Sequence, residues 1–420
     1  MKVKVCLINP PDTIVEDPLW DEPLGLLYLG AVLEKEGISV EVVDLNFHKD
    51  WGKELSRHDA DVYGIYCASS LLSSTLKVRD FLKTNFPYSK LIVGGPHATC
   101  MPESLVPYFD VVVKGEGEQT ILDVVKDYQH VRGPSHARNL PSIYVGRTVE
   151  NLDSLPFPAR HLAPIHKYHR KVGGEHSVGV ITARGCPNNC AFCSKVWGKT
   201  VRFRSAENVV AEVKEVVGKY GIKGLSFRDD TFTLNKSRLL KILYGLQCLD
   251  VKWRCITRVD QVDENTLMAM KNAGCVEIVY GTESGSQKIL DNLRKGTTVE
   301  QNAKAITLTK QAGIPCKAAF IVGSPGETWG TVNETLRFVE EHAPDKAILC
   351  TFTPYPGSPV WENPDEFNMK ILTRDVTKYQ VVGPGMEGNV VVETEEMTAK
   401  DIAEAHDMML SRFKELGIVD

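Results

Sequence analysis

The sequence has 420 residues, with 49 Lys and Arg against 54 Asp and Glu, which gives a formal net charge of −5. This length is typical of two or three domains, and the near balance of charge gives no electrostatic reason to expect nucleic acid or an anionic membrane as a partner. No apolar run reaches the roughly 18 residues of a membrane span, and the first residues, MKVKVCLINPPD, read as a strand rather than a signal peptide, so we expect a cytoplasmic protein.

Short β-branched runs alternate with amphipathic segments over residues 1–130. The expected strands are 3–9, 39–45, 61–67, 90–95 and 110–115, and the expected helices include Leu24 to Glu36, Ser73 to Asn85 and Glu118 to Tyr128. This alternation predicts a Rossmann-like domain with a doubly wound, five-stranded parallel sheet. Ligands on such sheets bind beyond the carboxyl ends of the strands. The candidate residues at those ends are Pro10, Ser69, Ser70, Gly94, Gly95, Pro96, His97, Gly115 and Glu116.

The periodicity lapses over residues 131–172, which we expect to be a linker. Prolines and polar residues interrupt this segment, and it contains one expected short strand, 142–146. It also carries a basic group, made of His161, His166, His169, Arg170 and Lys171. The simpler interpretation is a solvated connector. If the segment faces a cavity instead, it could hold an anionic substrate.

A second alternation, over residues 173–365, predicts an open β/α barrel. The expected strands are 177–183, 223–228, 251–257, 275–281, 316–323 and 346–353. The expected helices are Ala206 to Tyr220, Ser237 to Leu249, Glu264 to Asn272, Ser286 to Leu293 with Glu300 to Gln311, and Trp329 to His342. Six units are too few for a closed eight-fold barrel, so we predict a partial TIM barrel. Residues 366–420 end in a helix that begins near Thr398, and we expect this segment to pack on the barrel and to border the substrate.

Three of the 11 cysteines, Cys186, Cys190 and Cys193, lie together after the first barrel strand, in ITARGCPNNCAFCSK (181–195). The other eight are scattered, mostly in apolar runs, as buried thiols of a reducing compartment are. A structural zinc site would need a fourth thiolate or imidazole, and the nearest imidazole, His176, lies ten residues before Cys186. An iron–sulfur cube held by three cysteines leaves one iron open to a substrate or cofactor.

The spacing C-x-x-x-C-x-x-C, with Phe192 before the last cysteine and a β/α barrel around it, resembles the radical S-adenosylmethionine (SAM) superfamily. The resemblance implies a 4Fe–4S cluster on Cys186, Cys190 and Cys193, with SAM chelating the open iron. One electron from the cluster would cleave SAM to a 5′-deoxyadenosyl radical. The resemblance also implies an external one-electron donor of the flavodoxin or ferredoxin type, and Phe192 would flank the nucleoside.

Polar and small residues at the other barrel strand ends are candidates for contacts with SAM. Glu283 could accept hydrogen bonds from both ribose hydroxyls or from the SAM ammonium group. Arg258 could pair with the SAM carboxylate, or with the nearby Asp260 instead. The two acids that end the second strand could contact SAM or position the substrate. The complete set of candidates is Phe192, Asp229, Asp230, Arg258, Glu283, Ser284 and Ser324.

Motifs along most of the chain resemble radical SAM enzymes with an N-terminal cobalamin-binding domain, the group that includes magnesium-protoporphyrin ester cyclases and radical methyltransferases. They are NPP (9–11), PLGLLYLGAVLEKEG (23–37), GGPHAT (94–99), GEGE (115–118), LDSLPFPAR (152–160), RDDTF (228–232), GTESGS (281–286) and GSPGET (323–328).

The resemblance implies that cobalamin binds at the N-terminal strand ends named above. The glycines there would let the backbone approach a large flat ligand, and Ser69 and Ser70 could donate hydrogen bonds to its amide-bearing rim. The sequence lacks the D-x-H-x-x-G stretch of cobalamin mutases, so we expect no histidine on the lower face of the cobalt. The alternative is a generic nucleotide-binding or vestigial domain.

Three hypotheses for the function follow. The first is methylation of an unactivated carbon of a small-molecule substrate, with cobalamin as the methyl carrier. The second is a rearrangement, cyclisation, epimerisation or dehydration that the same radical starts without methyl transfer. The third is a metal-binding module without enzymatic activity. Formation of S-adenosylhomocysteine beside 5′-deoxyadenosine would favour the first, 5′-deoxyadenosine alone the second, and one zinc per chain the third.

Overall fold

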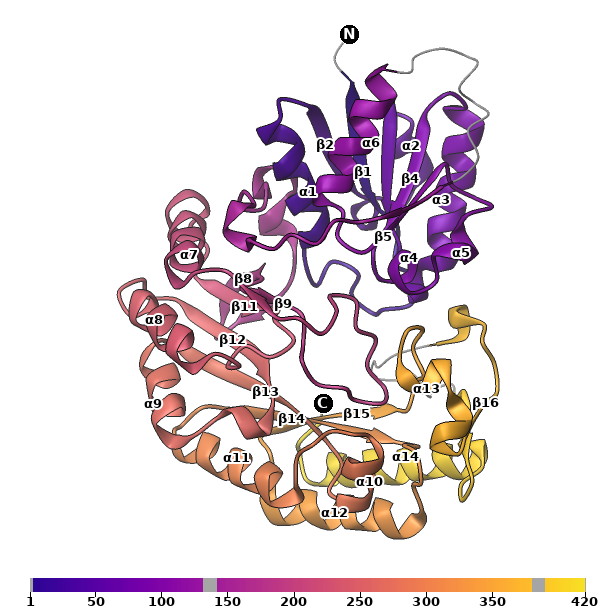
Figure 1. Ribbon diagram of the computed structural model, residues 1–420. Coiled ribbons are helices and arrows are strands. Elements are labelled where there is room, and N and C mark those ends of the chain that lie inside the picture. Colours follow the sequence, from indigo (N-terminus) through magenta and orange to yellow (C-terminus); the bar gives the residue numbers. More distant parts are fainter. Residues whose placement is uncertain (1–2, 131–141, 380–389, 420) are drawn as a thin grey trace. The chain divides into compact units, whose positions relative to one another are not determined.

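The structure, a computed structural model, describes residues 3–130, 142–379 and 390–419 (Figure 1). The chain separates into two compact units, Met1–His169 and Arg170–Asp420, and each is described by itself. Among the helices of the described ranges, none has the length and apolar character needed to cross a lipid bilayer.

The first unit is built on a parallel sheet in the order β2-β1-β3-β4-β5-β6. Its strands are β1 (Lys4–Asn9), β2 (Ser39–Asp44), β3 (Val62–Tyr66), β4 (Lys90–Gly94), β5 (Val111–Lys114) and β6 (Ser142–Val145). The predicted count of five strands is therefore wrong by one. The short strand expected in the linker joins this sheet beside β5, with Ser142 opposite Val111. An edge strand of four residues pairs on one side only, and its sequence pattern does not say which sheet it extends.

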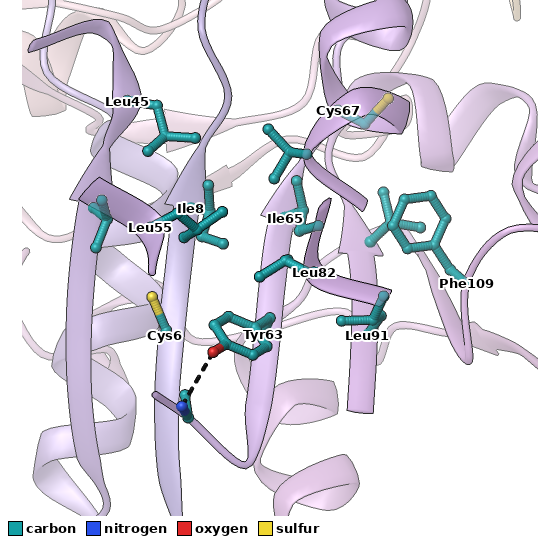
Figure 2. Close-up of a cluster of buried hydrophobic side chains, with 14 of the residues drawn as sticks. Cys6, Ile8, Leu45, Leu55, Tyr63, Ile65, Cys67, Leu82, Leu91 and Phe109 are labelled. Carbon is teal, nitrogen blue, oxygen red and sulfur yellow. Dashed lines mark hydrogen bonds between the residues drawn. The ribbon is translucent and has the colours of Figure 1, made fainter. Parts of the chain in front are cut away.

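Side chains of the first sheet alternate between two apolar cores. Cys6 and Ile8 of β1 point into one core, with Tyr63 and Leu82 (Figure 2), whereas Val5 and Leu7 belong to the other. Both faces are covered, as a doubly wound fold requires. The helices of this unit are α1 (Leu24–Lys35), α2 (Trp51–Leu55), α3 (Leu72–Asn85), α4 (Pro96–Cys100), α5 (Pro102–Leu105) and α6 (Glu118–His130).

The residues that precede the second unit pack on the first. The Ala159 N–H donates to the Leu27 carbonyl at 3.0 Å, and the Tyr168 hydroxyl donates to Asp44 at 2.9 Å. Two of the basic residues considered above as anion ligands face acids, since His161 lies 2.9 Å from Glu34 and His169 lies 2.9 Å from Asp17. These contacts favour a structural role for both histidines.

The second unit contains the predicted open barrel. Its sheet runs β15-β14-β13-β12-β11-β8-β7, in which six strands are parallel and β7 is an additional antiparallel edge strand. The strands are β7 (Lys171–Val172), β8 (Glu175–Val180), β11 (Gly224–Phe227), β12 (Lys252–Thr257), β13 (Cys275–Glu283), β14 (Cys316–Val322) and β15 (Lys346–Thr351). Two smaller pairs are β9 (Ala183–Arg184) with β10 (Arg202–Phe203), and β16 (Met369–Ile371) with β17 (Val392–Thr394).

Helices cover the outer face of the barrel sheet. Phe320 of β14 packs edge-on against Phe338 of one helix and Phe413 of the last helix. The last helix starts with the expected capping box, in which Thr398 and Asp401 bond to each other's backbone N–H. The helices are α7 (Ala206–Tyr220), α8 (Lys236–Leu246), α9 (Glu264–Asn272), α10 (Gln287–Asn292), α11 (Val299–Gln311), α12 (Trp329–His342), α13 (Pro359–Glu362) and α14 (Ala399–Glu415).

Candidate active site

The three cysteines lie on one loop of the second unit, which we call the cysteine loop (residues 185–201). The short ladder of β9 with β10 closes the loop at its base. Gly185 has a φ of 97°, and a Cβ atom there would collide with the Thr200 carbonyl, so the close approach requires glycine. The Cys186 N–H also donates across the loop to the Gly198 carbonyl at 3.2 Å.

The turn between Cys190 and Cys193 is fixed by two other parts of the unit. The Ala191 N–H donates to the Leu293 carbonyl at 2.9 Å, and the Ala191 carbonyl accepts from the Val360 N–H at 3.1 Å. The Ser194 hydroxyl donates to the Pro356 carbonyl at 2.7 Å. The cysteine loop is therefore attached to the segments that follow α10 and β15.

The thiols are close enough to affect one another electrostatically. Loss of solvation, followed by the charges of Cys190, Asp230 and Cys186, raises the pKa of Cys193 to about 11. In the described part of the chain, no three His, Cys, Asp or Glu side chains surround the position of one metal ion. The donor set itself fits a 4Fe–4S cube, because such cubes are held by cysteine thiolates and three cysteines lie on one short loop.

Glu283, at the end of β13, lies in a buried ion pair. Its carboxylate accepts a hydrogen bond from the Lys295 ammonium group at 2.6 Å, and each side chain is 7% exposed. Glu283 has a φ of 64°, which is uncommon for a residue other than glycine and is typical of functional sites. The second carboxylate oxygen can still accept a hydrogen bond from a ligand.

Arg258 pairs with Asp260, the alternative partner considered in the sequence analysis. Its guanidinium group donates to the two Asp260 oxygens at 2.9 and 3.1 Å, and to the Lys295 carbonyl at 2.9 Å. Burial raises the pKa of Cys190, while the charges of Lys295 and Arg258 lower it, so both cations lie near this cysteine. The Arg258 guanidinium group is thus bonded to neighbouring residues of the site.

Asp229, proposed above as a contact of SAM or substrate, holds the start of the cysteine loop instead. Its buried carboxylate accepts from the Thr182 N–H at 2.6 Å and the Ala183 N–H at 3.1 Å, and also from the Thr182 hydroxyl. Arg238 donates to the Thr182 carbonyl at 2.7 Å. Burial raises the pKa of Asp229. Its neighbour Asp230 is exposed.

A buried hydroxyl group that has no hydrogen-bond partner among the described residues is available to bind a ligand. The Ser324 hydroxyl after β14 is buried and makes no hydrogen bond within the described residues. Such a group costs about 1–3 kcal/mol unless something binds to it. The backbone next to it is fixed, since the Gly323 and Ser324 N–H groups donate to Glu327, whose pKa burial raises to about 7. Ser284, by contrast, is engaged with the Thr335 hydroxyl at 3.0 Å.

Some candidate residues of the first unit form hydrogen bonds with one another. His97 is buried, with Nδ1 2.9 Å from the Ser69 hydroxyl and Nε2 3.1 Å from the Ser104 hydroxyl. Both ring nitrogens are thus occupied, and burial lowers the pKa of His97 to about 4. Glu116 accepts from the Val149 N–H at 2.7 Å.

The remaining candidates of this unit contribute backbone or lie at the same strand ends. Gly95 has a φ of 109°, and a Cβ atom there would lie 2.8 Å from the Cys67 carbonyl. Gly115 donates its N–H to the Thr99 hydroxyl at 3.1 Å. The others follow the carboxyl ends of β1, β3 and β4, which meet at one edge of the parallel sheet: Pro10, Ser70, Gly94 and Pro96.

Lys295 is the site residue that sequence reasoning missed. It lies between α10 and α11, in a stretch with no recognised motif. The available signal was weak: the stretch follows the strand that carries Glu283, and lysine is the residue most able to neutralise a buried carboxylate there.

Comparison with known proteins defines the class. The model of the radical SAM superfamily matches residues 180–339, and that of the B12 binding domain matches residues 21–125. An uncharacterized methyltransferase of Pyrococcus horikoshii is 34% identical over 414 residues, which cover 92% of this chain and 88% of that protein. The anaerobic magnesium-protoporphyrin IX monomethyl ester cyclase of Cereibacter sphaeroides is 30% identical, over 89% of this chain and 64% of that enzyme.

Among solved structures, the fold is similar to that of the radical S-adenosylmethionine methyltransferase TsrM from Kitasatospora setae, with a TM-score of 0.72 and 19% identity over 97% of this chain and 81% of that chain. The protein is thus a radical SAM enzyme by fold and by the pattern of its cysteines. More narrowly, it belongs to the cobalamin-dependent radical SAM enzymes, which carry a B12 binding domain beside the radical SAM domain. Its cofactors are a 4Fe–4S cluster, SAM and cobalamin, as the sequence predicted.

Proposed function

We propose that the protein transfers a methyl group to an unactivated carbon of a small molecule. The observation that carries this proposal is the match to a methyltransferase along 92% of this chain and 88% of that protein, which is far longer than either the B12 binding domain or the radical SAM domain alone. A small-molecule substrate also agrees with the overall charge, which offers no feature for nucleic acid.

The residues described above have different roles in this reaction. Cys186, Cys190 and Cys193 hold the cluster, and Glu283 and Ser324 are the groups best placed to receive hydrogen bonds from SAM or give them to it. When bound, the cluster supplies the electron that splits SAM, and the corrinoid carries the methyl group. Asp229 and Arg238 keep the start of the cysteine loop in place. A buried site also keeps water away from a reactive radical.

The test is anaerobic incubation of the reconstituted protein with methyl-labelled SAM, a reductant and candidate small molecules. Methyl transfer yields S-adenosylhomocysteine, 5′-deoxyadenosine and a labelled product. If neither nucleoside product forms while the protein holds four irons and four sulfides, the proposal is wrong. One zinc per chain after anaerobic purification would contradict the whole cluster assignment.

A non-methylating reaction is the second candidate, because the relative from Cereibacter sphaeroides is a cyclase. The same incubation separates the two, since a rearrangement or cyclisation started by the radical gives 5′-deoxyadenosine without S-adenosylhomocysteine. The cyclase match covers only 64% of that enzyme, against 88% for the methyltransferase. We therefore favour methylation.

We also propose that the electron comes from an acidic protein of the flavodoxin or ferredoxin type, in the cytoplasm. From Thr182 to Ala206 the sequence has no acidic residue, and of its five basic residues Arg184, Arg202 and Arg204 are buried, which leaves Lys195 and Lys199 at the surface. Lys199, on the cysteine loop, is exposed. Opposite charge on a donor would speed its encounter with this loop. None of the 11 cysteines, all of which lie in the described residues, forms a disulfide, and this suits a reducing compartment.

A further inference from the structure

Lys295 is a charged residue in an unusual environment. It is 6% exposed, and lysine is almost never so buried unless it is paired. A buried ion pair is weak evidence for stability, because apolar residues of similar volume in place of both partners are often neutral or stabilising. The buried charge therefore calls for a functional explanation.

Contacts place this lysine beside the cysteine loop. Two residues before it, the Leu293 carbonyl accepts from the Ala191 N–H, within the turn that joins Cys190 to Cys193. The Lys295 ammonium nitrogen lies 5.9 Å from the centre of the Phe192 ring. Its own carbonyl accepts from Arg258 at 2.9 Å. Backbone and side chain are thus both fixed next to the residues between two cluster ligands.

The pairing of Lys295 with Glu283 is built into the backbone of β13. A Cβ atom at Gly281 would lie 2.5 Å from the bonded Glu283 oxygen and 2.8 Å from the Lys295 nitrogen, so glycine is required to make room for the pair. Glu283 has a positive φ where it forms this ion pair. A strained residue and a required glycine both serve one buried ion pair, which indicates that its geometry matters.

We propose that Lys295 is a positioning residue for the cluster and SAM: it holds the Glu283 carboxylate in the orientation that receives SAM, and its charge cancels that of Glu283 beside the cluster. Reduction potentials of iron–sulfur clusters depend on the net charge and hydrogen bonds around them. Removing the ammonium group leaves one uncompensated negative charge near the cluster, which opposes its reduction. It also leaves Glu283 free to turn away from SAM.

The inference rests on the cluster and SAM chemistry of the proposed function, and three variants test it: Lys295→Gln, Lys295→Arg, and the double change Lys295→Gln with Glu283→Gln. Each full-length protein is loaded with its cluster anaerobically, and iron and sulfide are counted. Two quantities are then measured: the midpoint potential of the cluster without SAM, by a titration followed by electron paramagnetic resonance, and the Kd for SAM.

We expect Lys295→Gln to shift the potential to a more negative value and to weaken SAM binding by about tenfold or more, because Glu283 loses the charged hydrogen bond that orients its carboxylate. Lys295→Arg should keep the wild-type potential. The double variant should also return to the wild-type potential, because it is neutral like the original pair, while its SAM binding stays weak. If Lys295 had only a structural role, the cluster potential of the double variant would not return to the wild-type value.

Three results would overturn the inference: a Lys295→Gln potential equal to that of the wild type, a double variant as negative as the single one, or unchanged SAM affinity in Lys295→Gln. If Lys295→Gln does not take up a cluster, uptake by the double variant supports the role of charge, and failure of uptake in both contradicts it. A wild-type protein that holds no cluster would instead contradict the proposed function itself.

Discussion

The two units differ in how they use polar residues at the carboxyl ends of their parallel strands. In the second unit, buried charged groups bond to the backbone and to one another around the cysteine loop, as Asp229 does with Thr182 and Lys295 does with Glu283. In the first unit, the neutral His97 is buried between two hydroxyl groups, and the buried acids Asp44 and Glu116 accept from neutral donors, the Tyr168 hydroxyl and the Val149 N–H.

This difference reflects what each edge has to hold. Three thiolates must be kept at set positions around a cluster, and charged hydrogen bonds fix a loop more firmly than neutral ones do. A corrinoid is large and flat, so a bare backbone at Gly95 and Gly115 would serve it better than single strong ligands. Four changes test this comparison.

Replacement of Cys186, Cys190 or Cys193 by alanine should have the largest effect. Each variant loses a ligand of the cluster, so we expect SAM cleavage to be abolished and iron content to fall. The first unit has its own apolar cores and should still bind a corrinoid. Iron analysis, 5′-deoxyadenosine formation and corrinoid absorbance measure the three outcomes. A variant that forms 5′-deoxyadenosine at the original rate would refute the assignment of the cysteines.

Asp229→Asn should impair the cluster next most strongly. The Thr182 and Ala183 N–H groups share one carboxylate oxygen, which an amide retains, but the other oxygen, which accepts from the Thr182 hydroxyl, becomes an NH2 group. The negative charge that strengthens all three hydrogen bonds is also lost. We expect a lower thermal midpoint and fewer irons per chain. Asp250→Asn is the control, because Asp250 is exposed and pairs with Lys223 rather than with the start of the cysteine loop. Equal iron content in both variants would show that the Asp229 carboxylate does not hold the loop.

His97 should make the first unit sensitive to acid. Burial lowers the pKa of His97 from its ordinary 6.5 to about 4 in the fold, so the unfolded chain binds more protons between these two pH values. The contribution to stability is complete above pH 6.5 and is lost as the pH falls to 4. A difference of about 2.5 in pKa corresponds to about 3 kcal/mol.

Hydrogen exchange of peptides from β4 and α4, corrected for the intrinsic rate at each pH, would follow this loss. His97→Gln should flatten the profile over that range, because glutamine does not titrate. An unchanged profile in the variant would assign the acid sensitivity to other groups.

Lys199→Glu should have the smallest effect. With an acidic protein donor at low salt, we expect a several-fold slower reaction, and added salt should reduce the difference. With dithionite the rate should stay the same. Lys214→Glu on α7 is the control, since Lys214 is exposed but lies outside the acid-free stretch. Equal slowing by both changes would remove the case for docking at the cysteine loop.

The sequence predicted most of the fold because its signals are local. Alternation over four to eight residues located the strands, and the spacing of Cys186, Cys190 and Cys193 located the cluster. The strands that were missed or misplaced are short: β6 and β7 lie at sheet edges, and β9, β10, β16 and β17 form two separate pairs. Their partners are chosen by tertiary contacts.

Side-chain pairing was harder to foresee. Asp229 stands in a polar run typical of a ligand contact, yet its partners lie 46 and 47 residues earlier in the chain. Lys295 carries no spacing signal, since its partner Glu283 lies 12 residues away across a helix. Sequence patterns place residues at a strand end, but they do not say which neighbours those residues bind.

The attachment of the cysteine loop to the end of the barrel bears on the biosynthesis of the enzyme. Ser194 bonds to Pro356, which is 162 residues further along the chain, and Ala191 bonds to Val360. A ribosome adds about 5–20 residues per second, so the loop emerges many seconds before these partners do. These contacts form only after the last barrel strand has been made, so we expect iron and sulfide to be inserted into a completed barrel and not into a growing chain.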